Sequence, residues 1–97
     1  MLNVPCYRQR QTAAGGGAVR NDPARVAWLN GVLARFVAAR RERMVLLDLH
    51  GFLCPGGRYR DRLDGRRLRD DGVHFSPDGA DLVWRWLGPQ LRRLAGG

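Results

Sequence analysis

The chain has 97 residues, which is enough for one domain at most. Hydrophobic residues make up 44% of the sequence, and the net charge is +8 with arginine as the only strongly basic residue, because lysine is absent. No run approaches the about 20 apolar residues that a membrane-spanning helix needs, and the start of the chain lacks the apolar stretch of a signal peptide.

The arginines are spread along the chain, with no aromatic RNA-binding signature and no zinc-ligand spacing beside them. A nucleic-acid partner is therefore not favoured. A basic chain can still bind anionic polymers or surfaces without catalysing a reaction. An arginine-rich binding module is thus the alternative to an enzyme.

The first half of the chain predicts a strand, a loop and a helix. Residues 1–4 are mostly apolar and predict a short buried strand, and the Gly-rich segment 8–20 predicts a flexible loop. A helix is expected to begin at 21–23, because Asp22 can cap free N–H groups and proline suits the first helical position. Apolar residues at helical spacing extend it to about Arg43.

The second half predicts a strand and a second long helix. Residues 44–49 are apolar on both faces, as in a parallel sheet covered by helices, and a Gly/Pro-rich loop follows at 51–57. Ser76 is expected to cap the last helix, which Gly88-Pro89 should kink or interrupt. The order strand, helix, strand, helix predicts an α/β fold with a short parallel sheet.

Two cysteines, Cys6 and Cys54, are too few for a zinc site. They could form one disulfide, which would place the chain outside the cytosol, or remain two thiols. No metal or cofactor is expected.

The segment most suggestive of chemistry is DGVHFSPDGA, residues 71–80. A histidine that takes a proton from a hydroxyl must present one ring nitrogen while the other is held. A carboxylate three residues earlier in a turn can hold that second nitrogen and stabilise the imidazolium. Asp71 and His74 have this spacing, and Asp70 is an alternative acid one residue too early.

Residues 71–80 resemble the last signature block of the SGNH (GDSL-type) hydrolase family, in which Asp-x-x-His is followed by a hydrophobe and a Ser/Thr-Pro helix start. Residues 3–7, 22–36 and 47–57 resemble the elements that precede this block. The likeness is closest to SGNH domains attached to bacterial membrane acyltransferases. By this resemblance His74 is the general base and Asp71 its partner.

The resemblance covers only the C-terminal half of the family's domain, so residues 1–97 are expected to be a single partial domain of a truncated or split protein. It implies a three-layer α/β/α, flavodoxin-like architecture. It also implies an ester or acylated-carbohydrate substrate and an extracytoplasmic location. A missing N-terminal half or a partner chain would complete the domain, and exposed sheet edges would favour self-association.

The rest of the family's site has no match in the chain. The nucleophile should be a serine in a Gly-Asp-Ser block, but Ser76 is the only serine. Asn21-Asp22 lacks the glycine that the family's Gly-x-Asn-Asp block requires, because Val19 stands there. Cys54 could pair with the histidine as a substitute nucleophile, and His50 could line the site.

Overall fold

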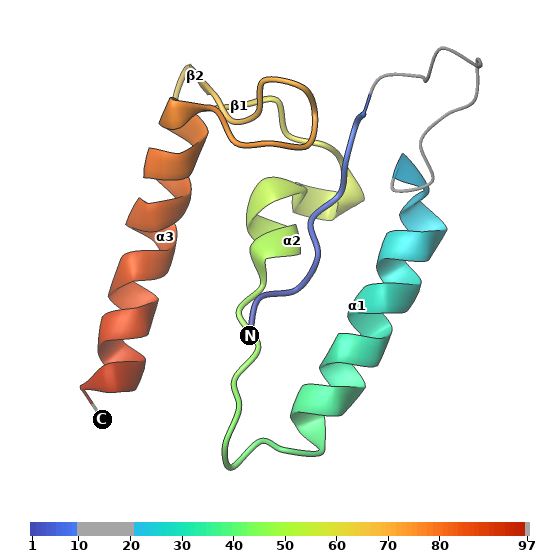
Figure 1. Cartoon of the computed structure of the whole chain (residues 1–97), viewed down its shortest axis with the longest axis vertical. Helices are drawn as coiled ribbons and strands as arrows, with labels where there is room; N and C mark the ends of the chain where they lie inside the picture. The colour runs from blue at the N-terminus through green and yellow to red at the C-terminus, as the bar shows by residue number, and fades with distance from the viewer. Residues whose placement is uncertain (10–20, 97) are drawn as a thin grey trace. The chain divides into compact units, whose positions relative to one another are not determined.

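The elements of the computed structural model are, in chain order, α1 (Pro23–Ala38), α2 (Leu49–Leu53), the short 3-10 helix η2 (Pro55–Gly57), β1 (Arg62–Leu63), β2 (Arg66–Arg67) and α3 (Pro77–Ala95) (Figure 1). The structure describes residues 1–9 and 21–96. The described chain forms two units, Met1–Arg60 and Asp61–Gly97. Most of the loop predicted over 8–20 lies outside the described residues. The prediction of a single partial domain stays a prediction.

Helix α1 begins where the sequence predicts. Asp22 is its N-cap and accepts a hydrogen bond from the Ala24 backbone N–H at 3.0 Å. The helix ends at Ala38, earlier than the predicted end near Arg43, and a series of turns follows. The residues after Ala38 are all exposed as far as Arg43, so no burial supports a further helical turn there.

The predicted three-layer α/β/α fold with a short parallel sheet is wrong. Within residues 1–9 and 21–96 the only sheet is the two-stranded antiparallel pair β1–β2. The two segments predicted as parallel strands meet only in one isolated parallel bridge, between Leu2 and Leu47. The Leu47 N–H donates to the Met1 carbonyl at 2.8 Å, and the Asn3 N–H donates to the Leu47 carbonyl at 3.3 Å.

The second predicted strand stops early because Asp48 starts a helix. Its carboxylate accepts a hydrogen bond from the Gly51 N–H at 2.9 Å and caps α2, so the chain turns immediately after Leu47. Two such short segments without further strands beside them cannot form a stable ladder.

In the second unit, β1 and β2 form a hairpin around Asp64-Gly65. Both turn residues have positive φ, 52° and 76°, as two-residue hairpin loops require. Helix α3 then begins after Ser76, which accepts the Gly79 N–H at 2.9 Å as the predicted cap. The start of α3 lies very close to the preceding chain, because a Cβ atom on Gly79 would clash with the Leu68 carbonyl.

Helix α3 runs through Pro89 to Ala95, so of the predicted kink or interruption at Gly88-Pro89 the interruption is wrong. Proline removes one helical hydrogen bond, the one to the carbonyl of Arg85. Arg85 is exposed, so water can reach that side of the helix. Among the described residues no helix is long and apolar enough to cross a membrane.

Candidate functional site

The Asp71–His74 turn is enclosed by a short antiparallel contact. Arg69 and Phe75 form an isolated bridge, and the Asp70 N–H donates to the His74 carbonyl at 3.2 Å. Gly72 lies inside the turn with a φ of 79°, a conformation that favours glycine. The buried Arg69 donates from a guanidinium nitrogen to the Gly72 carbonyl at 3.4 Å, which braces the turn from within.

Within this turn the Asp71 carboxylate contacts both the backbone and the ring that follow it. Oδ1 accepts the backbone N–H groups of Val73 at 2.9 Å and His74 at 2.7 Å. Oδ2 lies 2.6 Å from Nδ1 of the His74 imidazole. The carboxylate of Asp71, rather than that of Asp70, therefore holds the ring.

The electrostatics of the pair follow from these bonds. The hydrogen bond with the His74 side chain, together with the His74 and Val73 backbone N–H groups, holds the pKa of Asp71 well below its usual range. The ionised carboxylate can only accept a hydrogen bond, so a neutral His74 must carry its hydrogen on Nδ1. The His74 side chain is 82% exposed, which leaves Nε2 available to an incoming group. The catalytic roles of both residues stay predictions.

Ser76 is committed to structure. Its hydroxyl accepts the Gly79 N–H and donates to the Arg67 carbonyl, and the residue is 6% exposed. A hydroxyl that already donates one hydrogen bond and accepts another, and that has little access to solvent, is unsuited to attack an ester. The one serine of the chain is therefore a helix cap, as the sequence predicts.

Cys54 cannot act as a substitute nucleophile while it is oxidised, because it forms a disulfide with Cys6. His50 belongs to the first unit, where it lines a cavity of about 350 Å³ together with Asn3 and Asn30. The amides of both asparagines already bond the chain itself, Asn3 to Asp48 and His50, and Asn30 to the backbone of Val4. This cavity is thus built around structural hydrogen bonds.

Asn21 and Asp22 also have structural roles. The Asn21 amide exchanges two hydrogen bonds of 2.7 Å with the backbone of Gln9, and Asp22 caps α1. The Asn21 amide is thus bonded to the chain itself, and the Asp22 carboxylate, which only accepts hydrogen bonds, could not serve as an oxyanion donor.

The ion pairs at the start of α3 were not predicted from the sequence. Arg66 in β2 bonds Asp78 at 2.8 Å and Asp81 at 3.1 Å in the first turns of α3, and Arg85 bonds Asp81 at 2.9 Å. These bonds lower the pKa of Asp81, chiefly through Arg66. Exposed pairs stabilise little. The two Arg66 pairs connect the hairpin to the first turns of α3.

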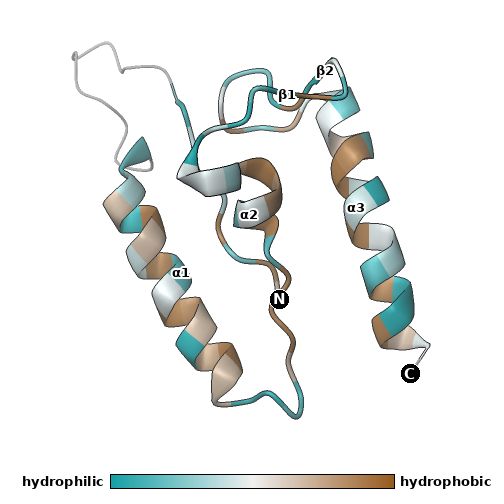
Figure 2. Ribbon diagram, turned by 180° about the vertical axis from the view of Figure 1, so that it is seen from behind, coloured by the Kyte–Doolittle hydropathy of each residue, from teal (hydrophilic) through white to brown (hydrophobic). Residues whose placement is uncertain are grey.

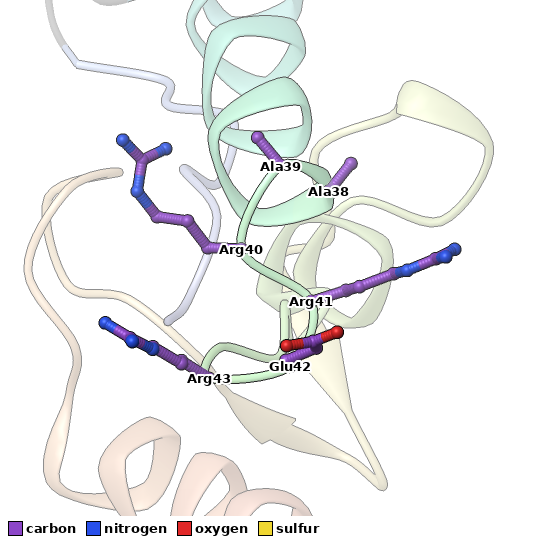
Figure 3. A pocket seen from close by; sticks show the side chains of 6 residues that line it. All are labelled: Ala38, Ala39, Arg40, Arg41, Glu42 and Arg43. Carbon is purple, nitrogen blue, oxygen red and sulfur yellow. The ribbon is translucent and has the colours of Figure 1, made fainter.

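A second cluster of charge lies at the end of α1. The turn after the helix lines a hollow of about 330 Å³ with three arginines and one acid (Figure 3). Arg40 and Arg43 point to one side of the turn, and Arg41 points to the other (Figure 3). The guanidinium groups do not converge on one point, so the hollow is not a cradle for a single small anion.

Comparison of the chain with protein-family models, with curated proteins and with solved structures finds no match. The assignment of a function therefore depends on the residues and geometry of the chain itself.

Proposed function

We propose that this chain carries the base and the acid of a Ser-His-Asp esterase or acyl-transfer site of the SGNH type. The single observation that carries the proposal is the 2.6 Å contact between Asp71 Oδ2 and His74 Nδ1, in a turn where the same carboxylate also accepts two backbone N–H groups. This is the arrangement by which a triad acid fixes the tautomer of its histidine.

The chemistry divides into two proton transfers at Nε2 of His74. First, Nε2 takes the proton of a serine hydroxyl while the serine oxygen bonds the ester carbonyl carbon. The imidazolium then gives that proton to the leaving alcohol as the C–O ester bond breaks, which leaves an acyl-serine. Water or an acceptor hydroxyl repeats the sequence and releases the acyl group. Asp71 stays ionised throughout and stabilises the imidazolium.

The serine and the oxyanion donors are not found in this sequence, so the proposal requires them from residues outside it or from a partner chain. The substrate is an ester or an acylated carbohydrate. Loss of one oxyanion donor alone costs on the order of 10²–10³ in rate. The isolated chain is therefore expected to form no acyl-enzyme.

The Cys6–Cys54 disulfide supports an extracytoplasmic location, because such bonds persist in oxidising compartments. Self-association is a further part of the proposal. It would use apolar side chains of the two segments joined by the Leu2–Leu47 bridge, in which Leu2 and Val45 are exposed.

The test is reconstitution. The reading frame upstream of the Met1 codon is sequenced, and the chain is produced together with any segment that contains Gly-Asp-Ser. Hydrolysis of p-nitrophenyl acetate is then measured. His74→Ala should lower kcat by on the order of 10⁴-fold or more. Asp70→Asn is the matched control, because it removes a neighbouring carboxylate that does not hold the ring. Full activity in His74→Ala would refute the assignment.

A further inference from the structure

Helix α1 has a second apolar face besides the one that the protein buries. Val26 and Val37 are buried, at 3% and 7% exposure. Trp28, Val32 and Phe36 recur at every fourth residue and are 65%, 39% and 41% exposed. Residues spaced by four lie on one side of a helix, so these three side chains form a continuous outer stripe.

The outer stripe lies in a strongly basic part of the chain. Between residues 22 and 43 five arginines stand against two acids, and every one of the arginines is exposed: Arg25, Arg35, Arg40, Arg41 and Arg43. The two acids are the N-cap Asp22 and Glu42, so α1 itself contains no negative side chain. Figure 2 shows hydrophobic residues along much of this helix.

Charge and apolar surface meet at the C-terminal end of α1. The Arg40 guanidinium carbon lies 3.7 Å from the centre of the Phe36 ring, and the same side chain donates to the Phe36 carbonyl at 3.1 Å. Beyond it, Arg43 and Arg41 extend to opposite sides of the turn (Figure 3). The positive charges are therefore spread over the surface at this end of the helix instead of converging on one point.

We propose that α1 lies on anionic lipid surfaces, with its outer stripe in the headgroup region and its arginines on lipid phosphates. Exposed tryptophan and phenylalanine beside arginine are characteristic of helices that lie in a membrane interface. Spread charges suit an extended anionic surface, whereas a discrete phosphate would need converging donors. Nucleic acid would leave Val32 without an apolar partner. The 16-residue helix is about 24 Å long, which is shorter than the hydrocarbon core of about 30 Å, so in this proposal it lies in the plane of the bilayer and does not cross it.

This surface is independent of the Asp71–His74 pair, and its experiment needs no catalysis. The full chain, with its disulfide intact, is sedimented with vesicles of phosphatidylcholine alone or with one third phosphatidylglycerol. The chain is expected to bind the anionic vesicles, and this binding should weaken as the salt concentration rises. Replacement of Arg41 or Arg43 by glutamine should weaken binding about fivefold for each charge removed.

The outer stripe is tested with a pair of matched tryptophan variants. Trp28→Ala should lower the partition coefficient on anionic vesicles about tenfold, by removing a large apolar contact from the interface. Trp84→Ala is the control, because Trp84 is equally exposed at 61% but lies on α3. It should bind as the parent does. Circular dichroism and the mass of the intact disulfide show that each variant is folded.

Four results would overturn the proposal. Equal binding to neutral and anionic vesicles would remove the role of the arginines. An equal loss in both tryptophan variants would mean unspecific adsorption. Binding that heparin abolishes and Trp28→Ala leaves unchanged would assign the surface to a soluble polyanion. If Trp28→Ala turned a dimer into a monomer and left lipid binding intact, the stripe would be a self-association face instead.

Discussion

Asp71 and His74 are joined at both oxygens of one carboxylate: Oδ1 accepts the His74 backbone N–H at 2.7 Å, and Oδ2 lies 2.6 Å from the ring nitrogen Nδ1. The backbone bond positions the histidine, and the side-chain bond orients its ring. The geometry of the pair is thus fixed locally, by four residues of one turn. It can be examined in the isolated chain, without a nucleophile.

The tautomer of His74 is the first consequence. When neutral, the ring should carry its hydrogen on Nδ1, because the ionised Asp71 carboxylate can only accept a hydrogen bond. Asp71→Asn should reverse this, since an asparagine can keep the backbone bond through its oxygen and donate its amide to Nδ1. Ring ¹⁵N chemical shifts of the neutral imidazole measure the tautomer. The same tautomer in both proteins would contradict the contact.

The titration of Asp71 is the second consequence. Its pKa is depressed, chiefly by the His74 side chain, so its contribution to stability is present above the ordinary carboxyl pKa of about 3.9 and is lost as pH falls through the lower, folded-state value. The ¹³C shift of the Asp71 carboxyl should therefore show no midpoint near 3.9. In His74→Ala the midpoint should move upward, and the two backbone N–H groups should still keep part of the depression. A midpoint at the ordinary value in the parent chain would refute the hydrogen bonds.

The start of α3 is predicted to be intolerant of a side chain at Gly79. A methyl group there would meet the Leu68 carbonyl, so Gly79→Ala should destabilise the second unit by about 1–3 kcal/mol through overpacking. Gly31→Ala is the control, in the interior of helix α1, because its Cβ would lie 3.5 Å from the end of the flexible Arg35 side chain, which is an ordinary contact. It should stabilise that helix by about 0.5–1 kcal/mol. Urea unfolding of both variants measures the difference, and equal effects would contradict the close approach.

The disulfide between Cys6 and Cys54 should account for much of the stability of the first unit. It closes a loop with a sequence separation of 48 residues, so its removal should cost about 4 kcal/mol by chain entropy. The double variant Cys6→Ser, Cys54→Ser should lose protection from hydrogen exchange in α2 and keep it in α3. Purified under oxidising conditions, the parent chain should react with iodoacetamide only after reduction. Labelling without a reductant would contradict the bond.

The sequence determined the features that depend on a few neighbouring residues. Asp22 and Ser76 were predicted as helix caps from their positions before proline, and both are caps in the structure. The proximity of Asp71 and His74 is also a local matter, because three residues of turn bring a carboxylate within reach of a ring. The hairpin was not predicted, although Asp64-Gly65 indicates one, since this dipeptide favours the positive φ angles of a two-residue turn.

Only the tertiary structure decided how distant segments combine. The apolar residues 44–49 fit a parallel strand by pattern, but a strand needs partners, and the described chain offers only a single bridge at Leu47. Asp48 caps α2, so Asp48 and Leu49 belong to the start of a helix and cannot extend a strand. The sequence left two alternatives for Cys6 and Cys54, a disulfide or two thiols. A bond between residues 48 positions apart depends on whether the fold brings the two cysteines together. Hydrogen bonds within a turn are set by neighbouring residues, whereas sheets and disulfides are set by the packing of the chain as a whole.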